Sequence, residues 1–201
     1  MAEILEQEPV AIAPRFIEKE TFLVGGPVDQ QLPLTIAEAE ELAQGRSFEL
    51  IDGRMVFKMG DRKHSEAQTV LIAAFFNYLE SNAIGKVYGE FSVRLWPESN
   101  HNFRTPDVSV FLNESLHPEE RYETQAPDLA IEIVSDDDRA TLLFEKARLY
   151  LEKGSKVVWI VFPSEKSVVV ITPNTRRWES EVLTCPELLP GFSLAVEKLF
   201  S

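Results

Sequence analysis

The sequence predicts an α/β (α+β) fold, in which helices pack on a mixed β-sheet. Three observations support this fold class. Strand-like apolar segments alternate with helical ones, an order that is typical of a sheet covered by helices. The composition, 44% hydrophobic and 26% charged, is that of an ordinary globular protein. The 201 residues are also enough to bury a sizeable core without disulfides or structural metals.

We expect the chain to begin with an extended arm, residues 1–31, followed by one domain, residues 32–201. The arm contains three prolines and a pair of adjacent glycines and has weak periodicity, with one short strand expected at residues 21–24. Early in the domain, Thr35 predicts the start of a helix, because Glu38 three residues later completes a capping box.

A β-hairpin is predicted after this helix, as an N-terminal addition to the sheet. Its sequence is FELIDGRMVFKM, in which two apolar stretches flank Asp52–Gly53, a strong signal for a two-residue turn. Apolar periodicity predicts the other elements. Helices are expected at residues 35–42, 64–81 and 139–153. Further strands are expected at residues 86–96, 107–112, 129–134, 157–162, 167–172 and 178–182, with a last strand or helical turn before the end.

The charge and the cysteine content bear on compartment and partners. The net charge is −13, which counts against tight binding of duplex DNA by a monomer, because phosphate contacts reward clustered Lys and Arg. Cys185 is the single cysteine, which favours a reducing compartment. The acidic N-terminus lacks a signal peptide's pattern, and no apolar run approaches the roughly 18 residues needed to span a bilayer. We therefore expect a cytoplasmic protein without membrane contact.

Two acidic residues stand in apolar strands and are candidates for a metal site. Glu132 alternates with apolar residues in LAIEIV, and Asp107 opens the strand in RTPDVSVF. A buried carboxylate needs a partner, and a divalent cation such as Mg²⁺ commonly relieves the repulsion between two carboxylates. The alternatives are an edge strand with Glu132 in water, and an aspartate that only closes a turn at the start of its strand.

Lys146 lies in the middle of an apolar helical stripe, one turn from Leu143 and one turn from Tyr150. A lysine in such a position either extends its ammonium group into water or meets a carboxylate. The second possibility is open to Lys146, because its helix directly follows the strand of Glu132.

Two further residues are candidates for the same site. His64 lies on the apolar side of its helix, where it could act in a site or make a structural hydrogen bond. Glu49, in FELIDG, could be a third acid in the site or a solvent-facing residue of the hairpin.

Five segments in this order resemble the putative restriction endonuclease domain family of bacteria, within the PD-(D/E)XK superfamily. The segments are FELIDGRMV, RTPDVSVF, APDLAIEIVS, DDDRATLLFEKARLYLEKGSKVVWIVFP and LPGFSLAVEKLF. The resemblance covers residues 32–201. Pro127–Asp128 would also match the PD motif, but Asp128 is too close to Glu132 to lie on a separate strand, so Asp107 is the better match.

The resemblance implies a restriction-endonuclease-like core with Mg²⁺ (or Mn²⁺) held by Asp107, Glu132 and the backbone carbonyl of Ile133. The superfamily places a lysine two residues after the glutamate, and here that position is Val134. The family supplies the lysine from the next helix instead, which matches Lys146.

The same resemblance matches Glu49 to the early acid of the family and His64 to its helix-start histidine. It also implies that the protein is a homo-oligomer. The acidic segment SDDDR after the Glu132 strand departs from the serine- and proline-rich turn of the family, and should attract a metal but repel phosphate.

We therefore expect a metal-dependent endonuclease that hydrolyses phosphodiester bonds of DNA, with Arg94 and Arg104 as the best local candidates for substrate contact. A dimer would help an acidic monomer to assemble a larger groove. The main alternative is a catalytically inactive nuclease fold that serves as a binding or assembly module. A scaffold without a ligand and a metal hydrolase for small phosphoesters are further alternatives.

Overall fold

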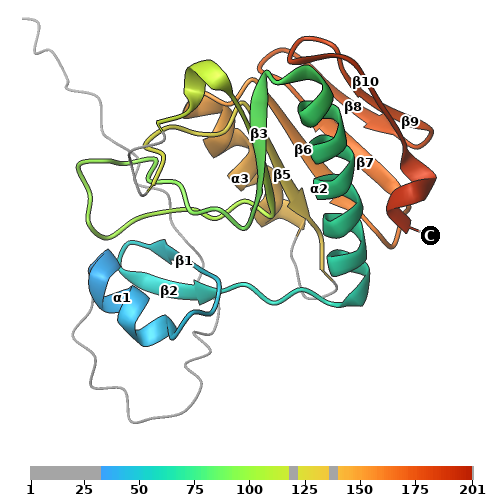
Figure 1. Ribbon diagram of the computed structural model, residues 1–201. Coiled ribbons are helices and arrows are strands. Elements are labelled where there is room, and N and C mark those ends of the chain that lie inside the picture. Colours follow the sequence, from blue (N-terminus) through green and yellow to red (C-terminus); the bar gives the residue numbers. More distant parts are fainter. Residues whose placement is uncertain (1–32, 118–121, 136–139, 201) are drawn as a thin grey trace, which may run out of the picture.

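A six-stranded mixed sheet forms the centre of the computed structural model, which describes residues 33–117, 122–135 and 140–200 (Figure 1). The strand order is β3-β4-β5-β6-β7-β8. β5 and β6 are parallel, and the other neighbouring pairs are antiparallel. The strands are β3 (Gly85–Gly89), β4 (Val108–Leu112), β5 (Leu129–Ile133), β6 (Val157–Phe162), β7 (Ser167–Ile171) and β8 (Arg176–Glu179).

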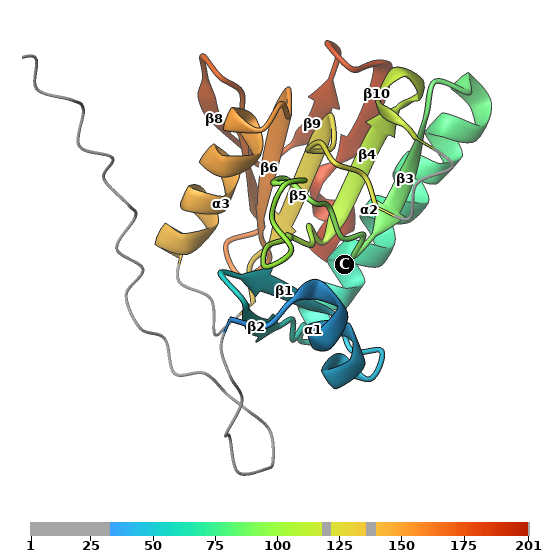
Figure 2. The ribbon, with the colours of Figure 1, turned by 90° about the vertical axis from the view of Figure 1, so that its left-hand side faces the viewer.

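Each face of the sheet is covered by one long helix (Figure 2). Helix α2 (Arg62–Asn82) packs on one face with Val108, Ile131 and Trp159, because successive side chains of a strand point to opposite faces. Helix α3 (Ala140–Glu152) covers the other face, against Ala130 and its neighbours. The α2 side is completed by the strand pair β9 (Val182–Cys185) and β10 (Leu189–Ala195) and a 3₁₀ helix, Val196–Phe200. Among the described helices, none is both long and apolar enough to cross a membrane.

A helix and a hairpin precede the sheet and lie beside one end of it (Figures 1 and 2). They are α1 (Ile36–Ala43), β1 (Phe48–Ile51) and β2 (Arg54–Phe57), which share a small apolar core of their own. The predicted capping box of Thr35 and Glu38 is confirmed at the start of α1. The predicted turn is confirmed as well: Asp52 and Gly53 both have positive φ, 49° and 73°, as a two-residue hairpin turn requires.

Replacing Gly53 should disturb the hairpin more than replacing Gly45, a glycine with a similar φ of 81°. A Cβ on Gly53 would overlap Pro33 and lie 2.6 Å from the Leu34 nitrogen, whereas a Cβ on Gly45 would have nothing within 4 Å. We expect Gly45→Ala to cost about 1–2 kcal/mol of backbone strain. Gly53→Ala should cost about 1–3 kcal/mol more through overpacking. Urea denaturation measures both, and equal losses would contradict the prediction.

Two expected strands differ from the structure. The strand predicted at residues 86–96 ends at Gly89, because Glu90 adopts a left-handed conformation (φ 47°) and the chain then leaves the ladder. The strand predicted at residues 178–182 is wrong: Trp178 pairs with Val169 in the main sheet, whereas Val182 pairs with Ala195 in the β9–β10 pair. The predicted arm, with its short strand at 21–24, lies outside the described residues.

Candidate active site

Asp107, just before β4, and Glu132, in the neighbouring strand β5, lie next to each other on the face that α3 covers. Val108 at the start of β4 pairs with Ile131 of β5, so Asp107 immediately before β4 comes to the position beside Glu132. Both carboxylates are buried, each residue being 2% exposed. The backbone nitrogen of Ile133 donates a hydrogen bond of 2.7 Å to Asp107 Oδ2, which fixes the aspartate against the end of β5.

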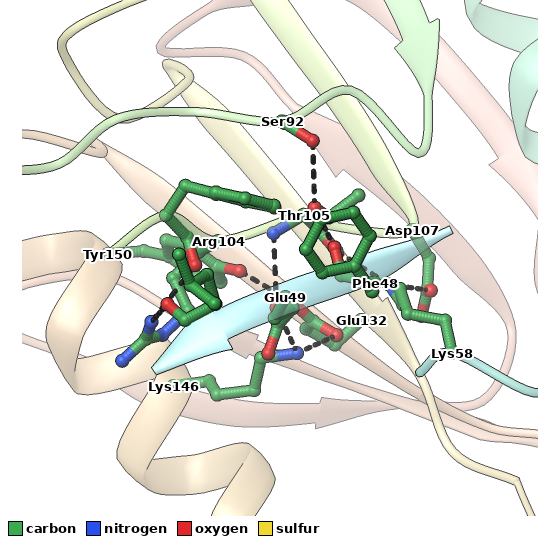
Figure 3. Close-up of polar contacts among 12 residues, drawn as sticks. Phe48, Glu49, Lys58, Ser92, Arg104, Thr105, Asp107, Glu132, Lys146 and Tyr150 are labelled. Carbon is green, nitrogen blue, oxygen red and sulfur yellow. Dashed lines mark hydrogen bonds and ion pairs between the residues drawn. The ribbon is translucent and has the colours of Figure 1, made fainter. Parts of the chain in front are cut away.

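Lys146 reaches these acids from the middle of α3 (Figure 3). Its ammonium group donates to Glu132 Oε2 at 2.8 Å and lies 3.0 Å from Glu49 Oε1. One turn later on the same helix, the Tyr150 hydroxyl donates to Glu132 Oε1 at 2.8 Å. Of the two alternatives for a lysine on an apolar stripe, the structure shows the one in which the ammonium meets carboxylates.

Glu49 reaches the site from strand β1, so the hairpin supplies one of the side chains of the site. The Thr105 nitrogen donates to Glu49 Oε1 at 3.1 Å, and the Thr105 hydroxyl donates to the Phe48 carbonyl at 2.9 Å (Figure 3). Glu49 is 5% exposed, so it is not a solvent-facing hairpin residue. The loop before β4 therefore ties the hairpin to the end of the sheet and brings a third carboxylate to Lys146.

His64 enters from the first turn of α2, which Asp61 caps by accepting a 2.8 Å hydrogen bond from the His64 nitrogen. The His64 Nε2 lies 3.2 Å from Asp107 Oδ2, and the side chain is 8% exposed. All five residues predicted as catalytic thus meet at one end of the sheet; their catalytic and metal-binding roles stay predictions.

Lys58 also belongs to this cluster, and sequence reasoning missed it. Its ammonium group forms an ion pair with Asp107 Oδ1 and donates to the Thr105 carbonyl at 2.6 Å, with the side chain 14% exposed. The one signal in the sequence was a lone lysine between Phe57 and Met59 at the end of a predicted strand.

Arg104 is buried, and the half-buried Arg94 is bonded to its own loop. Arg104 is 5% exposed and donates from Nη1 to the carbonyls of Leu50 and Phe103, both at 3.0 Å. Arg94 Nη2 donates to groups of its own loop, among them the Pro97 carbonyl at 3.1 Å. Substrate contact by these arginines stays a prediction that these bonds do not support.

Asp128, the other aspartate of a Pro-Asp pair, lies at the opposite end of β5. It accepts a hydrogen bond of 2.8 Å from the Leu112 nitrogen and pairs with Lys156 at 2.8 Å. The side chain of Asp128 is therefore separate from the Glu132 cluster. This agrees with Asp107, and not Asp128, as the aspartate of the PD motif.

The three buried carboxylates differ in their affinity for protons. Burial opposes ionisation of Asp107, but Lys58 and His64 outweigh burial and hold the pKa of this carboxyl well below its ordinary value. For Glu49, Lys146 and Arg104 likewise outweigh burial and lower the pKa. For Glu132, burial prevails over the nearby lysines and raises the pKa. Glu132 is therefore the carboxylate of this cluster that takes up a proton most readily.

The basic groups are held in their charged forms. Burial opposes the charge of Lys146, but Glu132 and Glu49 raise its pKa far above the ordinary value. Lys58 behaves in the same way, with Asp107 outweighing burial and raising the pKa. The cluster thus keeps two permanent positive charges among three carboxylates.

His64 should make the stability of the metal-free protein depend on pH. Burial lowers the pKa of His64, but the bond to Asp107 outweighs it and raises the pKa above 6.5. The stability that protonated His64 contributes is therefore fully present below its ordinary pKa, and it is lost as the pH rises through the raised pKa of the folded state. In urea denaturation with chelator, we expect the parent to lose stability relative to His64→Gln as the pH rises above 6.5. His101 and His117 are present in both proteins, so any difference in pH dependence comes from His64. If the stability of both proteins changes with pH in the same way, the prediction is contradicted.

A mixed sheet with a helix on each face, and Asp, Glu and Lys gathered at one end of neighbouring strands, defines a restriction-endonuclease-like protein. The family model of Uma2, putative restriction endonuclease, matches residues 34–197, and the chain belongs to this family. A crystal structure of a putative nuclease belonging to DUF820 from Anabaena variabilis has the same fold, with a TM-score of 0.70 and 24% identity. The match covers 84% of this chain and 98% of that chain. No curated protein matches the chain.

Proposed function

We propose that the protein is a metal-dependent endonuclease that hydrolyses phosphodiester bonds of DNA. The observation that carries the proposal is the arrangement of Asp107 and Glu132 side by side, with the Lys146 ammonium 2.8 Å from Glu132. Family membership supports the reaction class. We further propose that it works in the cytoplasm. We also propose that it is a homodimer, because a second copy would enlarge the DNA-binding surface of a chain with a net charge of −13.

The donor set fits Mg²⁺ or Mn²⁺. Mg²⁺ takes oxygen ligands and commonly uses one or two carboxylates together with water and substrate phosphate. Asp107 and Glu132 supply the carboxylates, and the Ile133 carbonyl is the proposed third ligand. In the described part of the chain, no group of three acid, His or Cys side chains is arranged to hold a metal, so the proposed site relies on two carboxylates and a carbonyl.

A bound Mg²⁺ would supply charge neutralisation at the phosphate and lower the pKa of a water molecule. Asp107 suits the ligand role, because its low pKa keeps it ionised. Lys146 is held by Glu49 and Glu132 in a position to neutralise charge that develops on the phosphate oxygens. His64 and Glu49 would position outer water molecules or relay a proton at the carboxylate ends.

Cleavage of supercoiled plasmid DNA tests this function. We expect nicked and linear products with Mg²⁺ or Mn²⁺ and none with chelator, and linearisation of closed circles distinguishes an endonuclease from an exonuclease. RNA and a small phosphodiester serve as alternative substrates. Cleavage of the small phosphodiester alone would show a different substrate class, and no cleavage of any substrate would contradict the proposal.

A catalytically inactive binding or assembly module is the second candidate. It is favoured by the ion pairs of Lys58 and Lys146, which neutralise much of the carboxylate charge before any metal binds. Titration calorimetry with Mn²⁺ separates the two candidates, because the module requires no metal.

A further inference from the structure

The four oxygens of the acid pair are all in contact with positively polarised groups of the protein. Asp107 Oδ2 accepts from the Ile133 nitrogen and contacts His64. Glu132 Oε1 accepts from the Tyr150 hydroxyl, and Oε2 accepts from Lys146. Within the described ranges, the remaining oxygen, Asp107 Oδ1, has Lys58 as its partner and no other hydrogen-bond donor. A metal ion that binds Asp107 through Oδ1 therefore meets the Lys58 ammonium group at that oxygen.

Lys58, unlike the other partners, lies outside the strands and helices of the fold. Ile133 lies in the central strand β5, and Lys146 and Tyr150 project from α3 one turn apart. Lys58 instead follows the last residue of β2 and opens an irregular segment, residues 58–61, that leads to α2. Moving the Lys58 ammonium off Asp107 breaks one ion pair, whereas displacing Lys146 breaks two.

Charge makes Lys58 and a metal competitors for one oxygen. An ammonium group and a divalent cation repel each other strongly at contact distance in a poorly solvated site. The Lys58 side chain is 14% exposed, so water screens this repulsion only slightly. Both cations cannot contact Asp107 Oδ1 together at low energy.

We propose that Lys58 occupies the metal-facing oxygen of Asp107 in the metal-free protein and sets the metal affinity of the site. Metal binding requires the Lys58 ammonium to leave Oδ1, although it can keep its bond to the Thr105 carbonyl. This inference rests on the proposed function, because it takes Asp107 as a metal ligand.

Titration calorimetry with Mn²⁺ tests the role of Lys58. Lys58→Met removes the competing charge at similar length, and we expect its Kd to fall by at least about tenfold, equivalent to about 1.4 kcal/mol. Lys58→Arg keeps a cation and should bind like the parent. Lys63→Met is the matched control, because it removes one positive charge from an exposed residue at the start of α2.

Thermal unfolding gives a second readout that does not depend on activity. With chelator, Lys58→Met should melt below the parent, because Asp107 loses its ion pair, and Mn²⁺ should raise its Tm by more than that of the parent. If Lys58→Met does not fold, Lys58→Gln keeps an amide donor beside Asp107 without the charge and serves in its place.

The outcomes separate the two proposals. If the neutral variants bind Mn²⁺ no more tightly than the parent does, Lys58 does not compete with the metal and the inference is overturned, while the metal site stands. If the parent and the neutral variants bind no Mn²⁺, or bind it equally well after Asp107→Asn, the metal site itself is wrong and both proposals fall.

Discussion

Replacing Asp107 by Asn or Glu132 by Gln should abolish metal-dependent DNA cleavage, with rates falling by about 10³-fold or more. The physical reason is the loss of one of two carboxylate ligands, since a bound metal supplies several kcal/mol of transition-state stabilisation and each 1.36 kcal/mol is tenfold in rate. Initial rates on plasmid DNA at saturating Mg²⁺ measure the effect. Circular dichroism shows whether each variant keeps its fold.

Asp128→Asn is the matched control for these variants. Asp128 is also a buried aspartate next to β5, 4% exposed, but it pairs with Lys156 at the other end of the strand. We expect this variant to cleave DNA at the rate of the parent. A folded Asp107→Asn or Glu132→Gln variant that retains the parental rate would show that these carboxylates are not part of the catalytic site.

Lys146→Met should have the largest effect on stability, about 3–5 kcal/mol, because it leaves buried carboxylates without their cation. Lys156→Met provides a matched comparison. Lys146 and Lys156 each pair with a buried carboxylate at 2.8 Å, but their side chains are 19% and 56% exposed. The more exposed pair should contribute about 1 kcal/mol or less. Urea denaturation at neutral pH measures both losses, and similar values would contradict this account of the site.

Acid should partly rescue Lys146→Met. Burial already raises the pKa of Glu132, and removing Lys146 removes the largest opposing charge. A carboxyl with a raised pKa in the folded state binds a proton more tightly when folded, so stability increases as the pH falls towards the ordinary value of 4.5. The double variant Glu132→Gln/Lys146→Met should recover part of the lost stability at neutral pH. Absence of both effects would show that Lys146 does not stabilise Glu132.

The parts of the fold that sequence reasoning predicted well carry their signals locally. The capping box of Thr35 and Glu38 and the turn at Asp52–Gly53 each depend on residues within four positions of one another. Lys146 could also be found, because its position on an apolar stripe of α3 demands a partner and the Glu132 strand immediately precedes that helix.

The misses depend on packing between distant segments. Lys58 meets Asp107, 49 positions later, only because the hairpin packs against the loop before β4 through Thr105. Residues 178–182 have a strand-like pattern, but Trp178 and Val182 belong to different sheets, and only the tertiary pairing separates them. The local periodicity of a sequence shows neither which distant segments pack together nor which strands pair.

A crystal structure of the protein with Mn²⁺, with the metal located by its anomalous scattering, would show whether Asp107 and Glu132 bind a metal ion. We expect a manganese peak between the carboxylates of Asp107 and Glu132 and beside the Ile133 carbonyl, with Lys146 still in contact with Glu132. Crystals soaked at millimolar Mn²⁺ that show no peak there, or a peak bound only to other residues, would contradict the claim that this acid pair is a metal site.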